Sequence, residues 1–270
     1  FDKANIDISD IKVKNSDEIP VFLVGFPRSG TTLLDTVLRT NKNISVIEEK
    51  PIVTEFINLL YKESEQTEPH IENINDDFVL KMRNKYFSIR EKFLDKTNKV
   101  IIDKMPLNII YLGEIIRFFP NAKFILAIRN PYDCVLSCFM QSFKINDAMS
   151  NFFNLKDSAN CYDRVMNLWE IYKNKFSINY HQVKYEDLVY DFEKITKDLF
   201  KFLNVEWNEE VLNFYKFSKS RGYISTPSYN QINQPIYSQS VSRWKNYKNQ
   251  ILNVDKILSP WASKFEYNND

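Results

Sequence analysis

The stretch that decides the fold is Val21-Phe22-Leu23-Val24-Gly25-Phe26-Pro27-Arg28-Ser29-Gly30-Thr31-Thr32-Leu33-Leu34. A short apolar run, a loop with a glycine at each end and apolar residues at helical spacing predict a strand, a phosphate-binding loop and a helix. The first turn of such a helix leaves backbone N–H groups unpaired, and the helix dipole places partial positive charge there. A phosphate ester or a sulfate fits that end of the helix.

The loop departs from a Walker phosphate loop at one position. Only four glycines occur in the chain, and Gly25 and Gly30 bound this loop, as expected where the backbone turns sharply or approaches another group. Thr31 stands where the Walker pattern has lysine, and Arg28 supplies a positive charge within the loop instead. The missing lysine argues against an ordinary ATPase or GTPase. A tight strand–helix turn without a ligand is the alternative interpretation of this loop taken alone.

The string from Arg28 to Thr32 resembles the 5′-phosphosulfate loop of the sulfotransferases that use 3′-phosphoadenosine 5′-phosphosulfate (PAPS). The likeness extends from about residue 19 to about residue 250 and is closest to the tetratricopeptide-linked bacterial and the protein-tyrosine sulfotransferases. Three further blocks agree with this family in order and spacing, namely Asp103-Lys104-Met105-Pro106-Leu107-Asn108, Arg129-Asn130-Pro131 with Ser137, and a polar loop at 225–237 followed by Arg243-Trp244. Four blocks in order make a chance match improbable.

Strands and helices alternate along the chain, which predicts an α/β fold with a central parallel β-sheet flanked by helices. The resemblance implies the sulfotransferase version of this P-loop-type fold. Residues 1–18 are polar and weakly patterned, so we interpret them as a lead-in or linker to a single domain over residues 19–270. The expected strands lie at 20–25, 44–48, 100–102, 124–128 and before residue 185, and the expected helices at 30–41, within 54–95, and at 108–118, 131–143, 156–178 and 185–203.

Composition narrows the class of protein. A chain of 270 residues with 44% hydrophobic and 15% aromatic residues can form one large core. Its net charge of +1 indicates neither nucleic acid nor a membrane surface as a partner, and it has no apolar run of about 18 residues that would predict a membrane span. Cys134 and Cys138 are expected to be small buried thiols. We expect a cytoplasmic protein, although a chain that begins with Phe1 is consistent with a fragment of a longer one.

The resemblance assigns residues to the two ends of the donor nucleotide. It implies that the 3′-phosphate is held by Arg129, Ser137 and Arg243 and that Tyr185 lies near the nucleotide. Arginine suits this role because its planar guanidinium binds phosphate oxygens in a bidentate way. The 5′-phosphosulfate would be held by Arg28, Ser29, Gly30, Thr31 and Thr32. The protein-tyrosine enzymes have a further arginine where this chain has Gln141, so the resemblance does not imply that phosphate contact in this chain. They have a lysine where this chain has Arg243.

Catalytic roles follow from the same resemblance. Glu49 matches the position of the general base better than Glu48 does, although adjacent carboxylates on a turn are often simply solvated. Lys104 and Ser228 would stabilise charge on the transferring sulfuryl group, together with Arg28 of the phosphate loop. A general base must reach the acceptor hydroxyl and be ionised at the working pH.

The implied activity is in-line transfer of the sulfuryl group from PAPS to an acceptor hydroxyl, with PAP as the product and no essential metal. The sequence contains no readable signal for the acceptor, which could be a tyrosine, a carbohydrate or another small molecule. Two alternatives remain: a P-loop small-molecule kinase, which would use Asp103 for Mg²⁺, and a catalytically inactive nucleotide-binding module.

Overall fold

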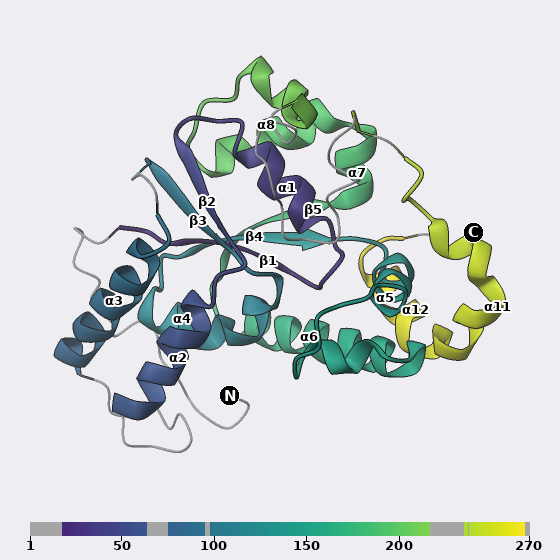
Figure 1. Cartoon of the computed structure of the whole chain (residues 1–270), viewed down its shortest axis with the longest axis horizontal. Helices are drawn as coiled ribbons and strands as arrows, with labels where there is room; N and C mark the ends of the chain where they lie inside the picture. The colour runs from purple at the N-terminus through teal and green to yellow at the C-terminus, as the bar shows by residue number, and fades with distance from the viewer. Residues whose placement is uncertain (1–17, 64–74, 95–97, 217–234, 237, 268–270) are drawn as a thin grey trace.

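A single parallel sheet forms the centre of the molecule. The computed structural model describes residues 18–63, 75–94, 98–216, 235–236 and 238–267, and in it five strands lie in the order β2-β3-β1-β4-β5 (Figure 1). The strands are β1 (Val21–Gly25), β2 (Ile44–Glu48), β3 (Val100–Lys104), β4 (Lys123–Ile128) and β5 (Asn179–Lys184). Every adjacent pair is parallel, so the carboxyl ends of all five strands share one edge. The predicted α/β class is confirmed.

Helices cover both faces of this sheet, as Figure 1 shows. One face carries α1 (Thr31–Leu38), α7 (Tyr185–Tyr190) and α8 (Phe192–Phe202). The other carries α2 (Ile52–Glu63), α3 (Asp76–Glu91), α4 (Leu112–Phe118) and α6 (Leu155–Lys175). Beyond the carboxyl edge lie α5 (Pro131–Phe139), α11 (Lys248–Ile251) and α12 (Asp255–Lys264). Short 3₁₀ helices occupy Pro106–Tyr111, Met149–Phe152, Glu209–Asn213, Arg243–Tyr247 and Leu252–Val254.

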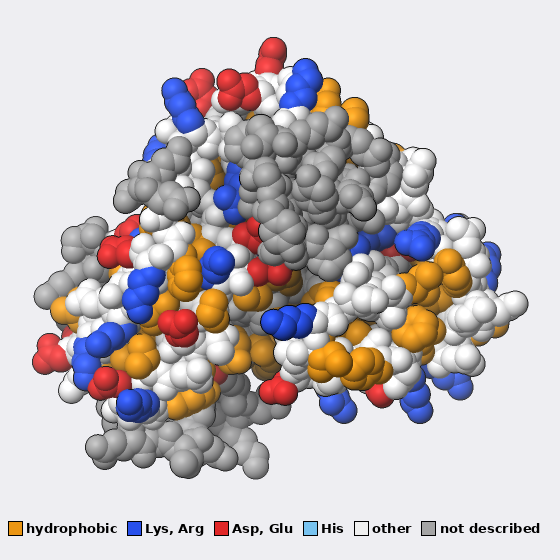
Figure 2. Space-filling model, viewed as in Figure 1, with side chains coloured by type: hydrophobic (Ala, Val, Ile, Leu, Met, Phe, Trp, Pro, Cys, Tyr) orange, Lys and Arg blue, Asp and Glu red, His pale blue; other side chains and the backbone are white. Residues whose placement is uncertain are grey.

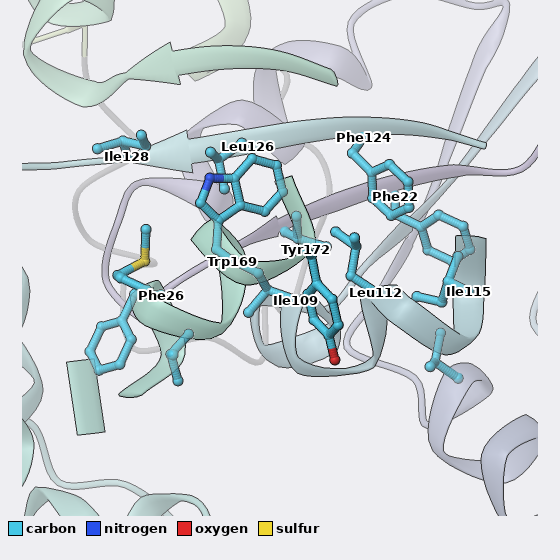
Figure 3. Packing of buried hydrophobic residues seen from close by; sticks show 14 of the residues in the cluster. Phe22, Phe26, Ile109, Leu112, Ile115, Phe124, Leu126, Ile128, Trp169 and Tyr172 are labelled. Carbon is cyan, nitrogen blue, oxygen red and sulfur yellow. The ribbon is translucent and has the colours of Figure 1, made fainter. Parts of the chain in front are cut away.

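Alternation along β1 divides the core into two layers. Phe22 and Val24 belong to the larger layer, under α2 to α6, whereas Val21 and Leu23 belong to the layer under α1 and α8. In the larger layer Phe22 stacks on Phe124 with ring centroids 5.5 Å apart, and Figure 3 shows both rings with Trp169 and Tyr172 of α6. Because successive strand residues point to opposite faces, one continuous apolar run fills both layers and fixes the phosphate loop at its end.

Element boundaries differ from the sequence expectations in several places. The helix expected at 30–41 ends at Leu38, and the one expected at 108–118 is a 3₁₀ helix followed by α4. The helix expected at 185–203 is two helices, because Asp191 has non-helical dihedrals (φ −135°, ψ 59°), a conformation that aspartate favours over mid-helix. Helix α5 ends at Phe139 rather than near residue 143. Phe139 and the next residue, Met140, are exposed, so burial no longer supports the helix there. Strand β3 extends two residues further than its β-branched run and includes Asp103 and Lys104.

The surface facing the viewer in Figure 2 carries basic and acidic side chains interspersed, in keeping with the net charge of +1. The two cysteines expected to be buried, Cys134 and Cys138, are fully buried free thiols. No described helix has the length and apolar character needed to cross a membrane.

Candidate active site

The phosphate loop joins the carboxyl end of β1 to the first turn of α1, as predicted. Gly30 precedes α1 with a left-handed φ of 99°, and a Cβ atom there would lie only 2.9 Å from Cδ2 of Tyr185. At Gly25 a Cβ atom would lie 2.5 Å from the carbonyl oxygen of Ala127. Both positions therefore require glycine, one for conformation and space and the other for the close approach of β4.

Helix α5 supports this loop from the side. The Arg28 Nε donates a hydrogen bond of 3.0 Å to Ser137 Oγ, and the Arg129 Nη1 donates one of 3.2 Å to the backbone carbonyl of Arg28. The Cys138 thiol also lies 3.3 Å from the carbonyl oxygen of Pro27. Arg28 thus contacts both Arg129 and Ser137, which were predicted to bind the same nucleotide, although 109 positions separate Arg28 from Ser137.

Arg129 lies at the centre of the cluster. Its guanidinium lies 4.8 Å from the centre of the Tyr185 ring, within the range of a cation–π contact, and its Nη2 donates to the backbone carbonyl of Ser240. The Arg129 Nε and the Ser29 Oγ are both buried without a hydrogen-bond partner among the described residues. Buried polar groups are normally paired, so these two atoms fit a bound anionic ligand.

A pocket opens beside Arg129. Its lining includes Ser137 and Arg243, both of which were predicted to contact the donor nucleotide. The remaining lining residues are Asp133, Leu136, Met140 and Ser240. Two arginines and a hydroxyl around one pocket can bind a phosphate through charge-assisted hydrogen bonds. The side-chain amide of Gln141, just after the end of α5, donates to the neighbouring Ser142 carbonyl (3.4 Å), and Gln141 is not among the residues that line the pocket.

The two candidate bases lie around Lys104, at the carboxyl ends of the edge strand β2 and its neighbour β3. Lys104 is fully buried, and its Nζ lies 2.9 Å from Glu49 Oε1 and 3.2 Å from Glu48 Oε1. The side chain of Glu49 is 36% exposed, whereas that of Glu48 is 11% exposed. Glu49 follows the last residue of β2 with a left-handed φ of 49°, and its amide donates to the Lys104 carbonyl (2.8 Å). Glu49 is thus the more accessible carboxylate.

Asp103 lies on the opposite face of β3 from Lys104. It is fully buried in the larger core layer beside Tyr86 of α3, and Asn108 Nδ2 lies 3.5 Å from its Oδ1. Burial raises the pKa of this carboxyl to about 7. Because Asp103 points into the core, away from the cluster around Lys104, its carboxylate is not placed to bind a metal ion at the phosphate loop.

Two buried carboxylates that the sequence reasoning missed hold the site together. Asp133 accepts hydrogen bonds from the backbone amides of Ser242 (2.8 Å) and Trp244 (2.9 Å). Glu186 accepts from the amide of Asn130 (3.0 Å) and from the hydroxyl of Tyr267 (2.8 Å). Burial raises the pKa of both carboxyls.

Only Asp133 was detectable from the sequence. It lies four residues after Arg129 and four before Ser137, and residues at that spacing share one helix face. Glu186 has no such signal, because nothing in the sequence shows that Tyr267, 81 residues away, contacts it. Trp244 is buried and stacks on Tyr132 with ring centroids 4.7 Å apart.

One predicted catalytic residue, Ser228, lies outside the described residues, as does most of the polar loop around it. Among the described residues, no group of three His, Cys, Asp or Glu side chains is placed to hold a metal ion.

Comparison with known proteins agrees with the resemblance. The model of the sulfotransferase family matches residues 20–209. An uncharacterised protein of Aquifex aeolicus is 30% identical over 254 residues, which cover 92% of this chain but only 33% of that protein. Protein-tyrosine sulfotransferase 1 of Danio rerio is 26% identical over 241 residues, covering 86% of this chain and 67% of the relative. This chain therefore spans a third of one relative and two thirds of the other.

Solved structures share the fold. The sulfotransferase domain of the curacin biosynthetic pathway aligns with a TM-score of 0.61 at 19% identity, covering 93% of this chain and 99% of that domain. A mouse sulfotransferase in complex with PAP aligns with a TM-score of 0.51 at 18% identity, covering 94% and 86% of the two chains. The family match, the parallel sheet and the phosphate loop at its carboxyl edge lead to the same conclusion: the chain belongs to the sulfotransferase family.

Proposed function

We propose that this chain transfers the sulfuryl group of PAPS to an acceptor hydroxyl and releases PAP. The observation that carries the proposal is the direct contact between two anion-binding elements. The phosphate loop, through Arg28, contacts Ser137, and Ser137 also lines the pocket of Arg129 and Arg243. A nucleotide with anionic groups at both its 5′ and 3′ positions has a charge at each of these places, whereas ADP or ATP has none for the second.

Glu49 acts as the general base in this proposal. Its carboxylate takes the proton of the acceptor hydroxyl while the acceptor oxygen bonds to sulfur and the bond between sulfur and the bridging phosphate oxygen breaks. Lys104, held beside Glu49, and Arg28 stabilise the charge that grows on the leaving oxygens, a role that the resemblance also gives to Ser228. The catalysis is positioning and electrostatic stabilisation, as in phosphoryl transfer.

The kinase alternative is less well supported. A P-loop kinase would be expected to have a lysine at position 31 of the phosphate loop, where this chain has Thr31. It would also need a carboxylate for Mg²⁺, and the candidate Asp103 is buried on the core side of the sheet. A non-catalytic module would have no need of the accessible Glu49 beside a fully buried lysine.

The test is transfer of label from radiolabelled PAPS to a panel of tyrosyl peptides, sugars and small phenols. Glu49→Gln should lower the transfer rate by about a hundredfold or more, the range for a lost general base, and leave PAP affinity unchanged. Glu48→Gln is the matched control, because it also removes a carboxylate from Lys104. Full activity of Glu49→Gln, or loss of activity in Glu48→Gln instead, would remove Glu49 from this role.

A further inference from the structure

Asp133 lies inside the candidate donor pocket although it carries the same sign of charge as the expected ligand. It is 1% exposed, lies on α5 between Arg129 and Ser137, and lines the pocket with both. A carboxylate at a phosphate site would repel the anion unless its own charge were engaged. Its two oxygens are in fact engaged by backbone amides, with Oδ2 accepting from Ser242 and Oδ1 from Trp244.

Those two amides flank Arg243, the second arginine of the pocket. Ser242 has a left-handed φ of 56°, a conformation that costs a non-glycine residue free energy and persists only where its surroundings hold it. The segment is fastened at two further points, since Arg129 Nη2 donates to the Ser240 carbonyl and the Trp244 ring stacks on Tyr132. Asp133 is thus the side chain that fixes the backbone on both sides of Arg243.

Charge balance agrees with this arrangement. Burial raises the pKa of Asp133, whereas Arg129, whose Nη2 lies 4.0 Å from Asp133 Oδ2, and Arg243 both act in the opposite direction and favour the ionised carboxylate. A carboxylate accepts hydrogen bonds at both oxygens, whereas an amide in its place would present an NH₂ group to one of the two backbone N–H donors. Only an acidic side chain can therefore satisfy both amides.

We propose that Asp133 is a positioning residue of the donor site, which holds Arg243 at the pocket and thereby determines affinity for a nucleotide with a 3′-phosphate. Asp133 does not itself contact the nucleotide; it acts through the backbone of Ser242 and Trp244. The inference rests on the proposed function, and it adds a residue that this function alone does not require.

A double-mutant cycle on the full chain tests this role. PAP and ADP are titrated into the wild type, Asp133→Asn, Arg243→Ala and the double variant. We expect Asp133→Asn to weaken PAP binding by about tenfold with ADP binding unchanged. In the Arg243→Ala background, Asp133→Asn should have no further effect, because the residue through which it acts is gone. Asp187→Asn, which removes an exposed carboxylate from α7, is the control and should not weaken PAP binding.

Equal weakening of PAP and ADP, or an undiminished effect of Asp133→Asn in the Arg243→Ala background, would overturn the proposal and leave Asp133 a merely structural residue. If Asp133→Asn does not fold, Asp133→Glu keeps the charge but shifts the carboxylate, and the same PAP-selective loss is expected. A wild type that does not bind PAP contradicts both this inference and the proposed function. A wild type that binds PAP with an unaffected Asp133→Asn overturns this inference alone.

Discussion

Replacing Gly30 by alanine perturbs both the phosphate loop and the ring that packs on it. Two costs are visible in the structure. The left-handed φ of 99° costs an L-residue with a Cβ about 1–2 kcal/mol. The new Cβ would also lie 2.9 Å from Cδ2 of Tyr185, well inside the optimal carbon–carbon separation of about 3.5–4.0 Å.

The ring of Tyr185 would therefore have to move by a few tenths of an ångström. Overpacking of this kind costs about 1–3 kcal/mol, which brings the expected loss to about 2–5 kcal/mol. Because the ring lies against the guanidinium of Arg129, Gly30→Ala should also weaken binding of PAP.

Urea unfolding of Gly30→Ala in two backgrounds separates the two costs. With Tyr185 present we expect Gly30→Ala to lower the free energy of unfolding by the full amount. In a Tyr185→Ala background we expect only the cost of the left-handed backbone conformation, about 1–2 kcal/mol. An equal loss in both backgrounds would refute the close contact between Gly30 and the ring. An alanine variant as stable as the wild type would refute the left-handed conformation as well.

Two further predictions concern buried carboxyls. Because burial raises the pKa of Asp103 to about 7, the folded state holds a proton that the unfolded state releases near pH 4, and stability falls as the pH rises from about 4 to about 7. The free energy of unfolding of Asp103→Asn should not show this fall with pH, and above pH 7 it should exceed that of the wild type by at most about 4 kcal/mol. If the two proteins have the same free energy of unfolding at every pH from 4 to 8, the raised pKa of Asp103 is contradicted. Tyr267→Phe removes the hydroxyl that donates to Glu186 and should lower the free energy of unfolding by about 1–3 kcal/mol; a variant as stable as the wild type in urea would show that this hydrogen bond contributes nothing.

Much of the fold follows from local pattern. The apolar runs of β1 and β4 and the glycine-bounded loop predict buried parallel strands and a strand–loop–helix unit, because neither depends on distant residues. The contact of Arg28 with Ser137 was not predicted: the family resemblance assigns the two residues to opposite ends of the donor nucleotide, and nothing local indicates that α5 lies beside the phosphate loop. The break at Asp191 was missed because the apolar periodicity continues through a residue whose backbone leaves the helix.

Other features depend on tertiary structure that pattern does not encode. The sequence places Asp103 and Lys104 together at a strand end, but adjacent strand residues face opposite sides of the sheet. Lys104 therefore joins Glu49, whereas Asp103 enters the core beside Tyr86. Glu186 is a further case, because its partner Tyr267 is 81 residues away.

Calorimetric titration with PAP, compared with ADP and ATP with and without magnesium, tests the central claim most directly. The account predicts that PAP binds without magnesium about a hundredfold more tightly than ADP, since Arg129 and Arg243 would add charge-assisted hydrogen bonds to the 3′-phosphate. Binding of ADP or ATP alone, and only with magnesium, would contradict the account and favour a kinase, and no binding of any of these nucleotides would favour an inactive member of the sulfotransferase family.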